Sequence, residues 1–332
     1  MRACVVGSGA WGTALAIRLL KNGHDVTMWT FEKDRIEEME RTRSNPRLPG
    51  AILPDGLKIS GDYACVRGAK LVVIAAPSFP MRSVCRGVAP HLDADAVVVS
   101  VTKGIEDGTL LRMSEVVAQE TGRIPVVLTG PSHAEEVALE IPTGCLAASE
   151  DQAMAEFVQD AFMSDAFRIY TSPDPVGAEL GGALKNVIAL CAGISDGLGH
   201  GDNTKAMLMT RGLTEIARLG MAMGARNETF VGLAGVGDLI VTCTSMHSRN
   251  RRAGILIGKG KTPADAMQEV GAVVEGYYAA KAAYDLAKKM QVEMPIVEAA
   301  YKVLYEGGSA EALTHDLLIR RKKSESEDAG WL

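Results

Sequence analysis

The sequence predicts an α/β protein in which a doubly wound sheet precedes an all-α C-terminal domain. In the first half, short β-rich apolar runs alternate with helical stretches, as parallel strands and their crossover helices do. From about Pro175 these runs stop and long helical stretches follow. A serine, two prolines and a glycine at 171–177 interrupt both patterns. We therefore expect domains at 1–174 and 175–332.

The strand candidates are near-continuous apolar runs, which are typical of strands buried on both faces. They are ACVVG at 3–7, DVTMWTF at 25–31, KLVVIAAP at 70–77, AVVVSVT at 96–102 and PVVLTG at 125–130. The run that starts at Ala10 is helical and stops at Gly23. Strand, helix and strand in this order form the first crossover unit of the predicted sheet.

Three long helical stretches mark the second half, at 176–194, 204–225 and 273–290. In the last of them, apolar or small residues recur at three- and four-residue intervals, which predicts one buried stripe. These residues are Ala279, Ala283, Leu286 and Met290. We expect Pro295 to begin the next helix, where its missing N–H costs no hydrogen bond.

Composition and charge favour a small-molecule ligand. The 332 residues are 47% hydrophobic and 23% charged, which suits globular domains with a sizeable core. The net charge of -6 argues against nucleic acid or an anionic membrane surface as the main partner. The six cysteines are scattered, so we expect neither a disulfide framework nor a structural zinc. With no leader and no run of 18 apolar residues, we expect a cytoplasmic protein without a membrane span.

Three glycines after the first strand, Gly7, Gly9 and Gly12, have the spacing G-x-G-x-x-G. The spacing alone is weak in a chain with 35 glycines, but here it follows a strand and enters a helix, as a dinucleotide-binding loop requires. Gly7 would allow the tight turn, Gly9 would admit a pyrophosphate, and Gly12 would let helix and strand pack closely. This context predicts a Rossmann-type domain that binds NAD or NADP.

The end of the second strand bears on the choice between NAD and NADP. Glu32 lies 20 residues after Gly12, where a carboxylate would accept hydrogen bonds from a ribose 2′-hydroxyl and repel a 2′-phosphate. Lys33 and Arg35 follow and could receive that phosphate instead, while Phe31 could stack on the adenine. A solvated turn is the alternative for this segment. Weighed against Lys33 and Arg35, the carboxylate of Glu32 slightly favours NAD over NADP.

Two lysines are candidates for the proton transfer that carbonyl reduction requires. Lys103 follows an apolar strand, at the edge where doubly wound sheets place their ligands. Lys185 is the only basic residue in the helical run 176–194, so we expect it to point inward, where burial lowers the pKa of a lysine. Taken singly, each lysine could instead reach solvent along its own methylene groups.

A third cluster lies in GVGDLIVTCTSMHSRNRRAG at 235–254. Asp238 follows a Gly-x-Gly, and Arg249 and Asn250 stand near a helix start, where a guanidinium and free N–H groups would hold a phosphate or a carboxylate. Solvated surface charge is the alternative. Of the six histidines, only His133 lies in a plausible site loop, and no metal-binding spacing occurs among them, so no metal is expected.

Six blocks together resemble the bacterial-type NAD(P)-dependent sn-glycerol-3-phosphate dehydrogenases in order and spacing, from Met1 to about Arg321. They are GSGAWGTALA, VTKGIE, GPSHAEEV, GGALKNVIALCAG, GVGDLIVTCTSMHSRNRRAG and VVEGYYAAK. The resemblance implies a Rossmann-type domain followed by a helical domain. It also implies reversible reduction of dihydroxyacetone phosphate to sn-glycerol 3-phosphate, in supply of glycerophospholipid synthesis.

The resemblance assigns catalytic and substrate-binding positions. Lys185 matches the family's catalytic proton donor and acceptor, Lys103 a lysine that touches cofactor and substrate, and Asp238 a residue that supports the catalytic lysine. The implied substrate contacts are Lys103, Gly130, Ser132, Lys185, Asp238, Thr242, Ser248, Arg249 and Asn250. The last three of these, Ser248, Arg249 and Asn250, match the family's phosphate-binding residues.

The implied cofactor contacts run from the glycine-rich loop into the helical domain. They are Gly7, Gly9, Ala10, Trp11, Gly12, Phe31, Glu32, Lys103, Ala134, Arg249, Val273 and Glu275. Many bacterial members carry a basic or polar residue where this chain has Glu32, so the sequence departs here from the usual NADP pattern. Trp11 replaces a smaller aromatic residue, a change that we expect to matter little.

Two other functions stay open at this point. A 3-hydroxy-acid dehydrogenase also joins a Rossmann-type domain to a helical domain with a helix lysine, but carries an asparagine four residues later, where this chain has Ala189. A dinucleotide-binding sensor without turnover would have lost its catalytic lysine, whereas Lys103, Lys185 and Asp238 are all present. A homodimer is expected only by analogy with other helical second domains.

Overall fold

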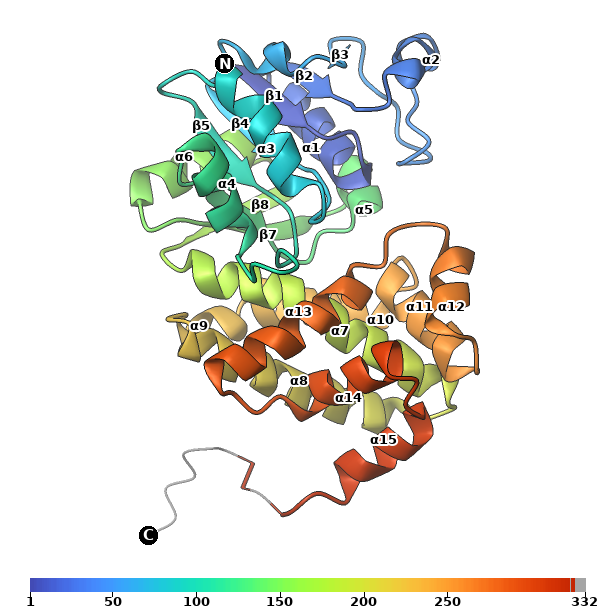
Figure 1. The fold of residues 1–332 in the computed structure, drawn as a ribbon. Coiled ribbons are helices and arrows are strands. Elements are labelled where there is room, and N and C mark those ends of the chain that lie inside the picture. The colour runs from blue at the N-terminus through green and yellow to red at the C-terminus, as the bar shows by residue number, and fades with distance from the viewer. Residues whose placement is uncertain (323, 326–332) are drawn as a thin grey trace.

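The computed structural model describes residues 1–322 and 324–325, and it contains both predicted halves. In Figure 1 an α/β domain lies above a helical domain. Residues 326–332, the end of the expected helical domain, lie outside the described residues. The predicted fold class is confirmed.

An eight-stranded sheet with the order β3-β2-β1-β4-β5-β6-β7-β8 forms the N-terminal domain. Neighbouring strands are parallel except for β6 and β7. The strands are β1 (Arg2–Val6), β2 (Asp25–Trp29), β3 (Lys58–Ser60), β4 (Leu71–Ile74), β5 (Val97–Ser100), β6 (Val126–Thr129), β7 (Thr143–Ala148) and β8 (Phe167–Ser172). The five predicted strands are confirmed as β1, β2, β4, β5 and β6, whereas β3, β7 and β8 have no counterpart in the prediction.

The strand order places a topological switch point between β1 and β4. From β1 the chain extends to β2 and β3 on one side, and from β4 to β5 and β6 on the other. Ligands of open parallel sheets bind at the carboxyl ends of the strands beside such a point. Gly7 follows β1 directly, and Lys103 lies three residues past β5, so both stand at this edge of the sheet.

Helices cover both faces of the sheet, which explains the near-continuous apolar runs of its strands. One face packs on α1, α5 and α6, around buried Leu15 and Phe162. The other packs on α3 and α4, around buried Met81 and Val116. The helices of this domain are α1 (Ala10–Lys21), α2 (Ile36–Thr42), α3 (Met81–Val88), α4 (Met113–Thr121), α5 (Ala134–Ala138) and α6 (Gln152–Phe162).

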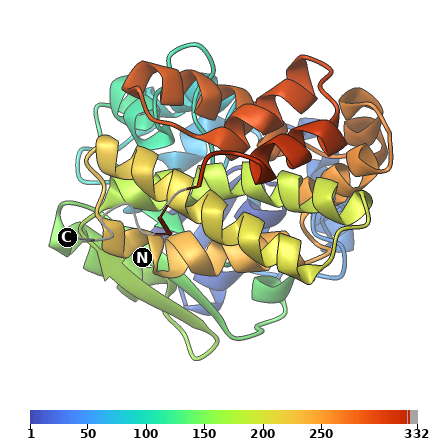
Figure 2. The same ribbon diagram turned by 90° about the horizontal axis from the view of Figure 1, so that it is seen from below.

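The C-terminal domain is built around α7, the long helix that crosses its middle in Figure 2. α7 packs against α8, α10, α11 and α13. The helices are α7 (Pro175–Gly197), α8 (Asp202–Ala222), α9 (Asn227–Phe230), α10 (Asp238–Thr244), α11 (Arg249–Gly258), α12 (Pro263–Val270), α13 (Glu275–Met290), α14 (Pro295–Tyr305) and α15 (Ala310–Leu318). A π-helical turn, η4 (Leu233–Gly237), leads directly into α10.

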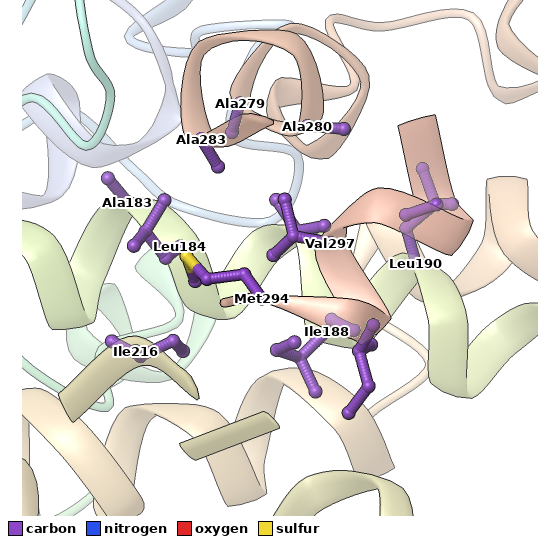
Figure 3. Close-up of a cluster of buried hydrophobic side chains, with 14 of the residues drawn as sticks. Ala183, Leu184, Ile188, Leu190, Ile216, Ala279, Ala280, Ala283, Met294 and Val297 are labelled. Atoms are coloured by element: carbon purple, nitrogen blue, oxygen red, sulfur yellow. The ribbon is translucent and has the colours of Figure 1, made fainter. Parts of the chain in front are cut away.

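The core of this domain lies between α7, α13 and α14. Figure 3 shows Leu184 and Ile188 of α7 below the alanines of α13, with Val297 of α14 beside them. In the predicted stripe of α13, Ala279, Ala283 and Leu286 are buried, and Met290 at the helix end is only partly buried. Pro295 is the first residue of α14, as predicted.

Glycines allow α7 and α11 to cross in close contact. A Cβ on Gly193 would collide with the carbonyl oxygen of Arg251, and a Cβ on Gly254 would collide with the carbonyl oxygen of Leu190. The crossing holds the start of α11 against the helix that carries Lys185.

By length and composition alone, α7 is apolar enough to cross a membrane, as is the bent pair 227–244 and 249–258. In the fold, 94% of the apolar window of α7 is buried inside the protein. Packing within the helical domain therefore accounts for the apolar character of α7.

Candidate active site

A buried carboxylate binds two lysines where the domains meet. Asp238, the first residue of α10, is 1% exposed, and its Oδ1 accepts a hydrogen bond from Nζ of Lys185 on α7. Its Oδ2 lies 2.7 Å from Nζ of Lys103. Nζ of Lys185 also donates to the hydroxyl of Thr242 at 2.7 Å, one turn further along α10. One carboxylate thus holds two ammonium groups, one from each predicted domain.

The loop after β6 completes this network. Nζ of Lys103 donates to the carbonyl oxygen of Gly130 at 3.1 Å, and the hydroxyl of Ser132 donates to the same oxygen at 3.0 Å. Six of the predicted site residues therefore lie in one hydrogen-bonded network: Lys103, Gly130, Ser132, Lys185, Asp238 and Thr242.

The electrostatics of the site single out Lys185. Burial lowers its pKa to about 7; the charge of Asp238 acts in the opposite direction, and that of Lys103 adds to the lowering. An amine whose pKa lies near neutrality can both give and take a proton. The arrangement therefore suits acid–base chemistry at Nζ of Lys185.

The glycine-rich loop at the start of α1 fits a dinucleotide pyrophosphate. Gly7 has a φ of +133°, and a Cβ there would lie 2.5 Å from the carbonyl oxygen of Ala75. A Cβ on Gly12 would collide with the carbonyl oxygen of Gly7. No described atom outside its own chain neighbours lies within 4 Å of the Cβ position of Gly9, and no side chain caps the first turn of α1. The loop thus leaves free N–H groups and an open approach for an anion. The first two residues of α1 are Ala10 and Trp11.

Arginines surround the carboxylate at the end of β2. Oε1 of Glu32 lies 2.9 Å from Nη2 of Arg47 and 3.6 Å from Nε of Arg35. Phe31 beside them is 72% exposed. Arg47 is not among the predicted site residues, because it comes from the loop after α2, where no spacing rule points to it.

Glu275, the first residue of α13, reaches from the helical domain to the edge of the sheet. Its Oε2 accepts a hydrogen bond of 2.9 Å from the hydroxyl of Ser78, which follows β4, and burial raises its pKa. Val273 precedes it and is partly buried, and Ala134 is the buried first residue of α5. Ser78 is not among the predicted site residues, although a polar residue just past a central strand is the signal that identified Lys103.

The three predicted phosphate-binding residues lie at the start of α11, but they differ in burial and in their hydrogen-bond partners. Ser248 is buried and caps α11 with its hydroxyl. Arg249 is exposed, and its side chain has no hydrogen bond or ion pair within the described part of the chain. Asn250 is buried, donates to Oδ1 of Asn186 at 2.8 Å and accepts from the N–H of Gly276 at 2.8 Å. Asn250 therefore ties α7, α11 and α13 together.

His133 precedes α5 beside this network, with its ring 5.7 Å from the ring of His247. Burial and the charge of Lys185 lower the pKa of His133, which favours its neutral imidazole. Its Nε2 is buried without a hydrogen-bond partner in the described structure. Among the same described residues, no group of three or more metal-binding side chains occurs.

Comparison with known proteins links both halves of the chain to one family. The model for the N-terminus of NAD-dependent glycerol-3-phosphate dehydrogenase matches residues 2–155, and the model for its C-terminus matches residues 174–315. A glycerol-3-phosphate dehydrogenase (NAD(P)+) from Thermoanaerobacter sp. is 52% identical over 98% of this chain and 99% of the relative. One from Geobacillus kaustophilus is 51% identical over 98% of this chain and 96% of the relative.

Solved structures agree with these relatives. The crystal structure of glycerol-3-phosphate dehydrogenase from Coxiella burnetii is 38% identical, with a TM-score of 0.92 over 96% of this chain and 99% of that one. The yeast enzyme, from Saccharomyces cerevisiae, is 28% identical, with a TM-score of 0.84 over 96% of this chain and 99% of that one. The chain belongs to the NAD-dependent glycerol-3-phosphate dehydrogenase family.

Proposed function

We propose that the protein reversibly reduces dihydroxyacetone phosphate to sn-glycerol 3-phosphate with NADH or NADPH. The observation that carries this proposal is the pair of lysines on the buried Asp238 carboxylate, at the edge of the sheet where a dinucleotide site opens. Membership of the family supports this choice of substrate, because the relatives are named as glycerol-3-phosphate dehydrogenases.

Lys185 transfers the proton in this reaction. In reduction its ammonium donates a proton to the C2 oxygen as that oxygen gains charge, and in oxidation the neutral amine removes the proton again. Asp238 and Thr242 fix the position of Nζ of Lys185. Lys103, bound to the other oxygen of Asp238, presents a second positive charge to the C2 oxygen of the substrate. The lowered pKa of Lys185 supports both directions, because both of its protonation states are populated near neutral pH.

The substrate phosphate binds at the start of α11. The exposed guanidinium of Arg249 is available for two parallel hydrogen bonds to phosphate oxygens. Ser248 and Asn250 shape this helix start, and Gly130 and Ser132 line the opposite loop. Binding at the phosphate orients the carbonyl carbon that reacts at a distance from it.

The dinucleotide is held by the loop of Gly7, Gly9 and Gly12 and by the first turn of α1. When bound, it supplies a hydride to C2 of the substrate or accepts one. Phe31 would pack on the adenine and Glu32 would accept hydrogen bonds from the ribose hydroxyls, which slightly favours NAD. Glu275 and Ser78, which are hydrogen-bonded to each other across the domain boundary, would stand beside this cofactor.

We extend the proposal to the organisation and setting of the protein. The end of β8 at Ser172 and the start of α7 at Pro175 support a dinucleotide-binding domain at 1–174 and a substrate-binding and catalytic domain at 175–332. The protein is cytoplasmic, its product supplies glycerophospholipid synthesis, and its helical domain forms a homodimer.

The stereochemistry of the oxidation tests the proposed reaction. The purified protein is given NAD with sn-glycerol 3-phosphate, with its enantiomer, with glycerol, or separately with a 3-hydroxy acid, and formation of NADH is followed. Turnover of the sn-isomer alone is the expected result. Turnover of a 3-hydroxy acid in place of all three would overturn the assigned substrate.

A further inference from the structure

Away from the active site, two cysteines of the N-terminal domain are in contact. Cys4 is a fully buried residue of β1, and Cys65 is a partly buried residue of the 3₁₀ turn η2 (Tyr63–Val66). Their Sγ atoms lie 3.5 Å apart. We propose that this pair is a redox modification site, at which a peroxide oxidises Cys65 and Cys4 then closes an intrachain disulfide.

The surroundings of the six thiols favour reaction at Cys65. The hydrogen bond from Cys4 lowers the pKa of Cys65, and the same contact, together with burial, raises the pKa of Cys4. When the pair ionises, the thiolate therefore forms on the partly exposed Cys65 and the proton stays on the buried Cys4. Burial raises the pKa of each remaining thiol to about 12, which keeps it protonated and unreactive. These four are Cys85, Cys145, Cys191 and Cys243.

The chemistry takes two steps. The Cys65 thiolate attacks one oxygen of hydrogen peroxide, an S–O bond forms as the O–O bond breaks, and the hydroxide that leaves takes up a proton to become water. The Cys4 sulfur then attacks the Cys65 sulfur, the S–S bond forms as the S–O bond breaks, and the hydroxyl group leaves with the Cys4 proton as a second water. Two thiols lose two electrons, and one peroxide is reduced to two waters.

The disulfide requires a movement of η2 and leaves β1 in place. A disulfide is about 2.0 Å long, so the two sulfurs must approach by roughly 1.5 Å from their separation of 3.5 Å. Cys4 cannot move, because β1 is paired with β2 and β4 on its two sides. η2 is a single turn capped by Asp62. One hydrogen bond from Arg2 to the carbonyl oxygen of Cys65 and the buried side chain of Val66 hold it against the sheet, so it can shift more easily than a strand paired on both sides.

This movement is expected to reach the dinucleotide site. The ring of Tyr63 in η2 stacks on Trp29 at 4.4 Å between centroids. Trp29 is the last residue of β2, and Phe31 and Glu32 follow it within three residues. Closing the disulfide displaces the Tyr63 ring, so the KM for NADH rises several-fold and the KM for dihydroxyacetone phosphate does not change. This consequence rests on the proposed function, whereas formation of the disulfide does not.

The experiment treats the full chain with a small excess of hydrogen peroxide and counts free thiols after unfolding. The titre falls from the six cysteines of the sequence to four, and dithiothreitol restores it. After tryptic digestion without reductant, peptide 3–18 is found linked to peptide 59–67. In the Cys65→Ser variant no disulfide forms, so its titre of free thiols does not fall after the peroxide treatment. Cys191→Ser, a matched change at one of the four unreactive thiols, still forms the same link.

The Cys4→Ala variant separates the two steps, because its Cys65 stays as the sulfenic acid and reacts with dimedone. Should that variant fail to fold, the peptide link in the wild-type chain still shows whether the disulfide forms.

A titre that stays at six, or oxidation of Cys65 with Cys4 left free, overturns the proposal. A linked but otherwise active enzyme with an unchanged KM for NADH overturns the coupling to the dinucleotide site. A chain that forms the link but shows no turnover in its reduced form leaves the disulfide standing and counts against the proposed reaction.

Discussion

Lys103 and Lys185 come from opposite sides of the domain boundary and bind opposite oxygens of the Asp238 carboxylate. Lys103 stands at the carboxyl edge of the sheet, and Lys185 lies in the middle of the most buried helix of the helical domain. The position of the proposed acid–base group therefore depends on the packing of the two halves against each other. Neither half alone supplies all three of these side chains.

Replacement of Lys185 by alanine should remove the proton donor and leave the dinucleotide loop intact. We expect kcat to fall by about 10²–10⁴-fold, the usual contribution of a positioned acid or base. NADH binding, followed by quenching of protein fluorescence, should be unchanged. Lys302→Ala, on the exposed side of α14, serves as the control. Near-normal turnover of the Lys185 variant would show that another group moves the proton.

The lowered pKa of Lys185 predicts opposite pH profiles for the two directions. Reduction needs the ammonium, so its kcat should fall as the pH rises through about 7. Oxidation needs the neutral amine, so its kcat should rise over the same range. Because the charge of Asp238 raises this pKa, Asp238→Asn should move both profiles to lower pH. Profiles that stay in place in this variant would contradict the assignment.

The exposed guanidinium of Arg249 should act on substrate binding more than on turnover. Loss of charge-assisted hydrogen bonds of about 1.5–3 kcal/mol predicts a KM for dihydroxyacetone phosphate about 10–100-fold higher in Arg249→Ala. Arg252→Ala, an exposed arginine of the same helix, should change little. Steady-state kinetics distinguish the two, and a loss of kcat with an unchanged KM would remove Arg249 from the phosphate site.

The Glu32–Arg47 pair should govern the choice of cofactor. In Glu32→Gln the repulsion of a 2′-phosphate is lost while Arg35 and Arg47 remain, so the ratio of kcat/KM for NADPH to that for NADH should rise about tenfold. Arg47→Ala should lower the same ratio. An equal effect of both substitutions on the two cofactors would mean that this cluster does not face the ribose.

Glu215 should make the stability of the helical domain depend on pH. It is buried and accepts the N–H groups of Ile296 and Val297 at the start of α14, and burial raises its pKa to about 7 from an ordinary 4.5. The folded chain thus holds a proton that the unfolded chain loses, so stability falls by ~1–3 kcal/mol as the pH rises from about 4.5 through 7. Denaturant unfolding should show this slope in the wild type and lose it in Glu215→Gln.

The fold was predictable where the sequence pattern reflects burial on both faces. The strands β1, β2, β4, β5 and β6 are apolar throughout because helices cover both sides of them. β8 is an edge strand with alternating burial, so FRIYTS does not stand out as a continuous apolar run. β7 is rich in small residues, and its antiparallel pairing with β6 leaves no mark on its sequence.

The site was predictable where a residue breaks its local pattern, as Lys185 does in an apolar helix. The partners of that residue were accessible only through the family resemblance, because Asp238 lies 53 positions away on another helix. Arg47 and the bridging contacts of Asn250 depend on how loops and helices meet in space. Spacing in the sequence carries no information about such contacts.

The most direct test of the central claim follows the absorbance of NADH while the purified protein and its Lys185→Ala variant are given dihydroxyacetone phosphate. We predict rapid loss of NADH with the wild-type chain and an initial rate at least a hundredfold lower with the variant, roughly the effect of removing a general acid. Equal rates for the two proteins, or no loss of NADH with either, would contradict the account.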